Sequence, residues 1–144
     1  VHNILKHCDK YDNKYLFQTK NSYILYRDYK HFMPAKTVIC STIESNIFHP
    51  GFMGDTLAPY DRAEAMNKLD QFERMITIEP IMQFDLDRLV YLIKLSGATS
   101  VNIGADSGNN HLPEPPKEKI MELISELEKF TAVKQKSNLK RLLK

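Results

Sequence analysis

Three apolar runs that each end in an acidic residue constrain the fold of this chain more than any other feature. The three segments are residues 74–80 (RMITIEP), 37–44 (TVICSTIE) and 100–106 (SVNIGAD). Each contains the apolar and β-branched residues that are typical of a buried strand, and each delivers a carboxylate where the strand stops. Because parallel strands end at one edge of a sheet, we expect these carboxylates to share the edge at which α/β folds bind their ligands.

Strands and helices are predicted to alternate along the chain. The strands are predicted over residues 15–17, 37–42, 75–78 and 101–103, and the helices over residues 2–12, 22–32, 62–72 and 86–96, with a last helix beginning at residue 115. Ser22, Asp61 and Asp85 are predicted to cap three of these helices, and Gly97 to end one. The alternation indicates four βα units with a parallel sheet. Four units are too few to close an eight-stranded barrel, so we predict an α/β fold with an open, partial TIM-barrel-like sheet.

The last part of the chain is strongly basic. Residues 129–144 hold six Lys or Arg and no Asp or Glu, although the net charge of the chain is only +2. We therefore predict a partial βα-barrel domain over residues 1–130 and a basic C-terminal helical tail over residues 131–144. A segment of this kind is usually a solvated helix, and the alternative is a contact with nucleic acid or an acidic partner.

The composition places the chain among ordinary globular proteins. Its 144 residues suffice for one domain, and 42% of them are hydrophobic. Cys8 and Cys40 are far apart and form no CxxC pair, no run approaches the roughly 18 apolar residues of a membrane span, and no signal peptide is visible. We expect a cytoplasmic protein with free thiols. Because the first residue is Val1, the sequence is also consistent with a fragment or a processed form.

Polar residues that follow the four predicted strands form the candidate site. They are Thr19 and Lys20, then Glu44 and Asn46, then Glu79, then Gly104, Asp106 and Ser107. Carboxylates on one rim repel one another unless a cation such as Lys20, or protonation, offsets their charge. Such groups could bind ribose hydroxyls or an amine, act as acid and base, or hold Mg²⁺. The turn after residue 103 lets the backbone approach a ligand, but it lacks the GxGxxG pattern of a dinucleotide site.

Four short motifs resemble the later strands of radical-SAM-like proteins, and among these an uncharacterised, phage-associated branch. The motifs are residues 17–20 (FQTK), 41–46 (STIESN), 77–81 (TIEPI) and 101–107 (VNIGADS). The resemblance implies a partial (β/α)₆ barrel whose strand ends bind S-adenosylmethionine. It implies that Glu44, Glu79 and the backbone of residues 104–106 lie near that cofactor. The CxxxCxxC motif that ligates the iron–sulfur cluster is absent, so no cluster and no radical chemistry are expected in this chain alone.

Three functional hypotheses remain open at this point. The chain is either the C-terminal part of a radical SAM enzyme, or a degenerate relative of one, that binds S-adenosylmethionine. Alternatively, it is a non-catalytic, phage-derived inhibitor that binds a host protein or nucleoprotein complex through the loop 47–60, the helix 22–32 and the basic tail. A metal-dependent hydrolase built on the three carboxylates is less well supported, because no histidine joins them. Exposed sheet edges also predict a homodimer.

Overall fold

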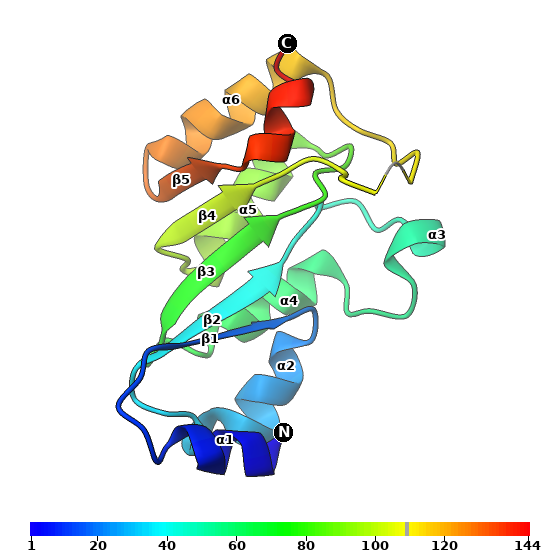
Figure 1. Cartoon of the computed structure of the whole chain (residues 1–144). Coiled ribbons are helices and arrows are strands. Elements are labelled where there is room, and N and C mark those ends of the chain that lie inside the picture. Colours follow the sequence, from blue (N-terminus) through cyan, green and yellow to red (C-terminus); the bar gives the residue numbers. More distant parts are fainter. Residues whose placement is uncertain (109) are drawn as a thin grey trace.

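The protein is an open parallel sheet with helices packed on one face. The computed structural model describes residues 1–108 and 110–144 (Figure 1). Five strands lie side by side in chain order, β1 (Tyr15–Thr19), β2 (Thr37–Thr42), β3 (Glu73–Ile78), β4 (Ser100–Ile103) and β5 (Ala132–Gln135). Every neighbouring pair of strands is parallel. The predicted α/β class with a parallel sheet is therefore confirmed, and the sheet is not closed.

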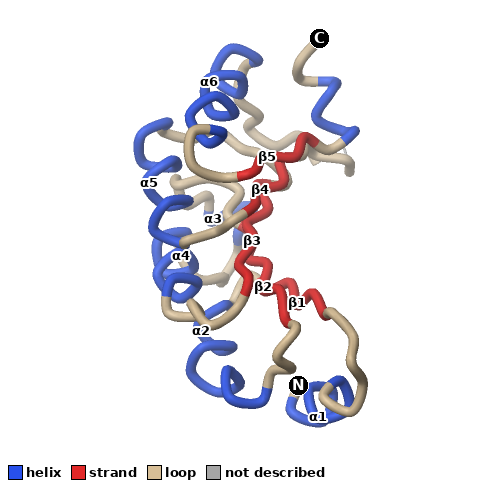
Figure 2. The backbone as a smooth tube through the Cα atoms, turned by 90° about the vertical axis from the view of Figure 1, so that its left-hand side faces the viewer, coloured by secondary structure: helices blue, strands red, loops and turns tan. Residues whose placement is uncertain are grey.

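Most of the helical residues form a layer against one face of this sheet. The helices are α1 (His2–Cys8), α2 (Ser22–Ile24), α3 (Pro50–Met53), α4 (Pro59–Asn67), α5 (Leu86–Ser96) and α6 (Lys117–Glu128). Figure 2 shows α2, α4, α5 and α6 on the same side of the strands, with α1 beyond β1 at one end of the sheet. Three shorter helical turns complete the chain, the π-helical η1 (Leu25–Tyr29) and the 3-10 turns η2 (Lys30–Phe32) and η3 (Ser137–Arg141). No helix within the described residues is long and apolar enough to cross a membrane.

The core lies between the strands and this helical layer. Its buried side chains include Ile39, Ile76, Ile78, Val101 and Ile103 from the strands, Leu89 and Ile93 from α5, and Ile120, Leu123, Ile124 and Leu127 from α6. Fully burying an aliphatic side chain of this size stabilises the fold by about 1.5–3 kcal/mol. The four buried residues of α6 recur at the spacing that places side chains on a single helix face.

Two of the three predicted helix caps are wrong. Asp85 does cap α5, since its Oδ1 accepts a hydrogen bond from the Arg88 amide at 3.0 Å. The cap of α2, however, is Asn21, and Asp61 lies inside the first turn of α4. Pro59 begins α4 before Asp61 because a proline is favoured at the first helical position, where its missing amide costs no hydrogen bond.

The segment predicted as a basic tail contains an additional strand. β5 pairs with β4, and η3 follows it with Leu139 completely buried. The structure thus has five strands where the sequence predicted four. β5 carries only two apolar residues, Ala132 and Val133, because one edge of the strand and most of its side chains face solvent, as is usual for edge strands that carry lysine.

Candidate functional site

The parallel register brings the carboxyl ends of all five strands to one edge of the sheet. Thr42 pairs with Thr77, Ile78 pairs with Ile103, and Ile103 pairs with Gln135. The residues that follow these positions therefore meet at the C-terminal edge. This edge carries Glu44 after β2, Glu79 after β3 and Asp106 after β4. Its electrostatics decide what the site can do, because three carboxylates in one region repel one another unless each is compensated.

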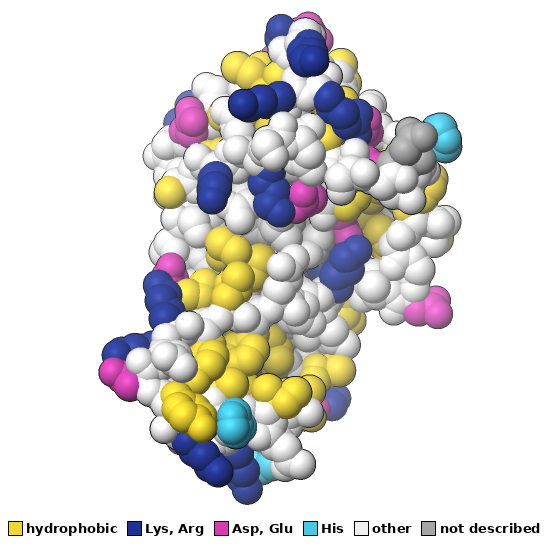
Figure 3. Space-filling model, in the orientation of Figure 1, with side chains coloured by type: hydrophobic (Ala, Val, Ile, Leu, Met, Phe, Trp, Pro, Cys, Tyr) yellow, Lys and Arg dark blue, Asp and Glu magenta, His cyan; other side chains and the backbone are white. Residues whose placement is uncertain are grey.

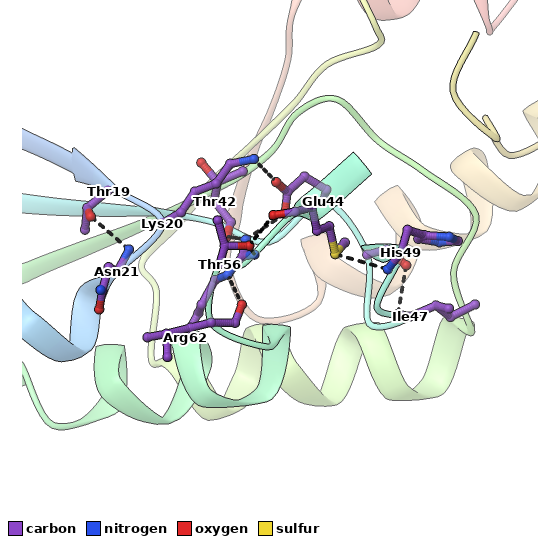
Figure 4. Close-up of polar contacts among 12 residues, drawn as sticks. Thr19, Lys20, Asn21, Thr42, Glu44, Ile47, His49, Thr56 and Arg62 are labelled. Atoms are coloured by element: carbon purple, nitrogen blue, oxygen red, sulfur yellow. Dashed lines mark hydrogen bonds and ion pairs between the residues drawn. The ribbon is translucent and has the colours of Figure 1, made fainter. Parts of the chain in front are cut away.

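Glu44 is buried between two cations. Only 2% of its side chain is exposed, Arg62 Nη1 lies 2.8 Å from Oε2, and Lys20 Nζ pairs with Oε1. Figure 4 shows both cations directed at the carboxylate. Burial raises the pKa of Glu44, but the hydrogen bond from Lys20 and the charges of Arg62 and Lys20 outweigh it, so that this pKa lies below its usual value. Glu44 is thus an ionised acceptor at neutral pH and is unsuited to proton transfer.

Arg62 is the residue that makes this arrangement possible, and sequence reasoning missed it. It belongs to α4 and its side chain is completely buried. Besides Glu44, its guanidinium donates to the carbonyl oxygens of Leu57 at 2.6 Å and Thr42 at 2.9 Å, and to Thr56 Oγ1 at 2.6 Å. Arg62 therefore ties the end of β2 to the loop before α4. An arginine at a helical position gives no sign in the sequence of being buried.

Thr19 and Asn46, two of the predicted site residues, form hydrogen bonds that stabilise the local backbone and do not face the other polar groups. Thr19 Oγ1 accepts from the Asn21 amide at 2.9 Å, which shapes the turn into α2 (Figure 4). Asn46 Oδ1 accepts from the Asp85 amide at 2.7 Å and so holds the start of α5. Asn46 lines a separate hollow with residues of α4 and α5, among them Tyr60 and Tyr91.

Glu79 is compensated by the segment after β5. Lys136 Nζ pairs with Glu79 Oε2, and Asn138 Nδ2 donates to Oε1 at 3.0 Å. Gly104 lies against the same carboxylate. A Cβ atom at position 104 would come within 2.6 Å of Glu79 Oε1 and 3.0 Å of Asn138 Oδ1, so only glycine fits without displacing these side chains. Asn138 Oδ1 is buried and has no hydrogen-bond partner among the described residues, which leaves one acceptor at this point of the edge.

Asp106 organises the loop after β4. Its carboxylate accepts from the Gly108 amide at 2.9 Å, the Asn110 amide at 2.5 Å and Asn110 Nδ2 at 2.7 Å. The hydrogen bond from Gly108 is the main cause that holds the pKa of Asp106 below its usual value. Arg141 donates to the Asp106 carbonyl oxygen at 2.8 Å and forms a bidentate ion pair with Glu114. Asp106 therefore acts as a loop scaffold.

Glu44 and Glu79 thus each pair with a cation, whereas the Asp106 carboxylate accepts hydrogen bonds from Gly108 and Asn110. Apart from Lys20, the cations at this edge come from residues that the sequence analysis did not assign to the site. Lys136 and Arg141, together with Asn138, belong to the segment interpreted as a tail. The sequence did contain a signal for these cations, namely a basic run over residues 129–144 in a chain whose strand-end carboxylates needed positive charge nearby. Its position next to them could not be inferred without recognising β5, because β5 is what directs the chain back to the C-terminal edge.

Two adjoining hollows lie along this edge. The larger, which we call the η3 groove, has a volume of about 970 Å³ and is lined by Asp106, Ser107, His111, Leu112, Glu114, Ser137, Asn138, Lys140, Arg141 and Lys144. The smaller, of about 330 Å³, is lined by Lys20, Glu44, Gly51, Phe52, Pro80, Met82, Asn110 and Leu112. Leu112 lies between the two hollows and lines both. Of the predicted residues, Lys20 and Glu44 thus face one hollow, and Asp106 and Ser107 face the other.

The described residues do not offer the ligands of an iron–sulfur cluster. Cys8 lies on α1 and Cys40 within β2, and burial raises the pKa of the Cys40 thiol to about 11. Cys40 is therefore a protonated thiol at neutral pH. Within residues 1–108 and 110–144, no three His, Cys, Asp or Glu side chains are grouped as a metal site requires.

The loop 47–60 is apolar and partly exposed. It contains the short helix α3, in which Met53 is buried whereas Phe52 is 53% exposed. Phe48 and Ile47 are 43% and 42% exposed. The loop thus anchors itself through Met53 and presents three apolar side chains, one of which, Phe52, borders the smaller hollow.

Comparison with known proteins identifies no relative of this chain. No protein-family model, no curated protein and no solved structure matches the chain.

Proposed function

We propose that the chain is a radical-SAM-like scaffold that binds S-adenosylmethionine at the C-terminal edge of its sheet and carries no iron–sulfur cluster of its own. The observation that carries the proposal is the η3 groove, which opens at the ends of β4 and β5. Parallel α/β sheets bind their ligands at this edge, and a volume of about 970 Å³ is within the usual range for small-molecule sites.

The groove offers the chemistry that an adenosine ligand needs. The carboxylate of Glu114 can accept from ribose hydroxyls, the hydroxyls of Ser107 and Ser137 can donate or accept, and Leu112 gives an apolar contact for the adenine ring. When bound, S-adenosylmethionine would supply a reactive sulfonium centre, and the residues of this chain would bind and orient it.

The same geometry favours binding over acid–base catalysis. Glu44, Glu79 and Asp106 each accept hydrogen bonds or ion pairs from protein groups, so none is left as a proton carrier. This pairing argues against a hydrolase that uses the three carboxylates together. In this proposal the one-sided helical layer and the strand order β1 to β5 correspond to consecutive units of a partial βα barrel. The proposal covers both a portion of a radical SAM enzyme and a relative that has lost the radical chemistry.

Calorimetric titration with S-adenosylmethionine tests this proposal. Ser137→Trp places an indole in the groove and is expected to weaken binding at least tenfold, because the ring occupies the ligand's volume. Ser125→Trp is the matched control, since Ser125 is exposed on α6 and does not line the groove. A folded chain that shows no saturable binding, or a Ser137→Trp variant that binds as tightly as the control, would contradict the proposal.

A second candidate function is protein association through the loop that contains α3. The observation that favours it is the exposure of Phe48 and Phe52, because aromatic side chains that remain in solvent often anchor an interface. The partner proposed is a second copy of this chain. Light scattering at micromolar concentration should then give twice the mass of 16.7 kDa. Phe48→Ser combined with Phe52→Ser should give the monomer, whereas Tyr91→Ser, at an equally exposed site on α5, should not.

A further inference from the structure

The positive charge of the chain is concentrated around the η3 groove. Residues 129–144 carry six Lys or Arg and no Asp or Glu, whereas the net charge of the whole chain is +2, so the rest of the chain is net negative. Figure 3 shows several Lys and Arg side chains over the end of the molecule that holds β5 and η3; others lie at the opposite end, beside apolar side chains near β1 and α1. The basic run of the sequence therefore lies over one end of the folded chain.

Half of these cations have no protein carboxylate to pair with. Lys129 pairs with Glu126, Lys136 with Glu79, and Arg141 with Glu114. The other three are Lys134, Lys140 and Lys144. None of them takes part in the nine ion pairs that the described residues form. The paired cations fix the local structure, and the three unpaired lysines remain available to an anion.

The unpaired lysines extend from the groove onto the strand face. Lys140 and Lys144 line the groove itself. Lys134 lies on β5 two residues before Lys136, so both point to the same face of the sheet, about 7 Å apart along the strand. Val133, which precedes Lys134, packs against the core, so Lys134 points to the face of the sheet opposite the layer of α2, α4, α5 and α6 (Figure 2). A small phosphate would contact only the groove, whereas an extended polyanion could contact the groove and β5 together.

We infer that the surface formed by Lys134, Lys140 and Lys144 binds the sugar–phosphate backbone of a nucleic acid. Phosphate contacts by lysine give affinity without reading sequence. Among the described residues that line the groove, His111 has the only aromatic ring, so the groove offers little surface on which bases would stack. The surface is therefore expected to bind different sequences with similar affinity. This inference is independent of the proposed adenosine ligand, which carries no phosphate.

Fluorescence anisotropy with a labelled 20-nucleotide oligo(dT) tests the inference. The unchanged chain should bind it saturably, and an oligo(dA) of the same length should bind with a similar dissociation constant. The triple variant Lys134→Ala, Lys140→Ala, Lys144→Ala should bind at least about tenfold more weakly. Because this variant lacks three lysines that would each neutralise a phosphate, the slope of the logarithm of affinity against the logarithm of salt concentration should fall in magnitude by roughly 2.

The matched control removes the same charge elsewhere. Lys6→Ala, Lys10→Ala, Lys117→Ala changes three exposed lysines outside the groove and should retain the affinity and the salt slope. Equal losses in the two triple variants would show that net charge alone causes binding and would overturn the inference. Absence of saturable binding by the unchanged chain would overturn it as well. So would displacement of the oligonucleotide by polyglutamate at the same charge concentration as by unlabelled oligo(dT), because the surface would then suit acidic peptides.

Discussion

Arg62 has the largest expected effect on stability of any single residue at the C-terminal edge. Its buried guanidinium compensates Glu44 and also satisfies the carbonyl oxygens of Thr42 and Leu57. Removing one partner of a buried ion pair usually costs about 3–5 kcal/mol, because the remaining charge stays buried without compensation. We therefore expect Arg62→Met to lower the free energy of unfolding by that amount in urea denaturation. Arg88→Met, at an exposed site on α5, should change it by less than about 0.5 kcal/mol.

Glu44 makes this stabilisation dependent on pH. Its pKa in the folded protein lies below the ordinary value of 4.5. A carboxylate with a lowered folded pKa stabilises the fold at pH values above the ordinary pKa, and the contribution disappears as the pH falls through the folded pKa. The difference in unfolding free energy between the unchanged chain and Glu44→Gln should be about 2 kcal/mol at neutral pH.

The same difference should shrink as the pH falls below about 4.5. Glu73→Gln is the control, because Glu73 lies at the opposite end of the sheet in an exposed pair with Lys14, and its effect should stay small throughout. A Glu44→Gln penalty that stays constant down to pH 3 would contradict the assigned ion pair.

At the scale of elements, η3 is an integral part of the domain. Leu139 is completely buried in the core although it lies within the segment interpreted from the sequence as a tail. Truncating a buried leucine to alanine costs about 2–5 kcal/mol. Leu139→Ala should therefore lower the unfolding free energy by this amount, measured by chemical denaturation. Leu16→Ala is the comparison, since Leu16 is 55% exposed on β1. A Leu139 effect as small as that of Leu16 would mean that η3 is only loosely attached.

The elements that the sequence predicts well are those with a strong internal period. α5 and α6 could be predicted because several of their apolar residues recur at helical spacing. β2 could be predicted because it is a run of six strand-forming residues, all of which are buried. β5 lacks such a signal. It is short, half of its residues are polar, and it becomes a strand only because β4 offers it backbone partners. Pairing with β4 in the folded chain, and not the local strand propensity of the sequence, therefore determines that these residues form a strand.

At the scale of the whole molecule, the sequence predicted which strand ends meet at one edge of the sheet but not the electrostatics of that edge. The rule that acidic strand ends share an edge followed from the βα alternation alone. The cations that compensate Glu44 and Glu79 could not be predicted in the same way, because Arg62 comes from the helical layer and Lys136 comes from the far end of the chain. This compensation changes the functional interpretation, since it argues against acid–base catalysis by these carboxylates and favours the proposed binding site.

The most direct test of this account is an NMR titration of the isotope-labelled chain with S-adenosylmethionine. We predict saturable shifts for amides at the C-terminal edge, with Gly104, Ser107, Leu112 and Ser137 changing most, because these residues lie at or beside the η3 groove. Amides at the opposite edge, such as those of Thr37 and Ser100, should stay unchanged. Shifts centred on the opposite edge, or none at a saturating ligand concentration, would contradict the claim that the C-terminal edge is the binding site.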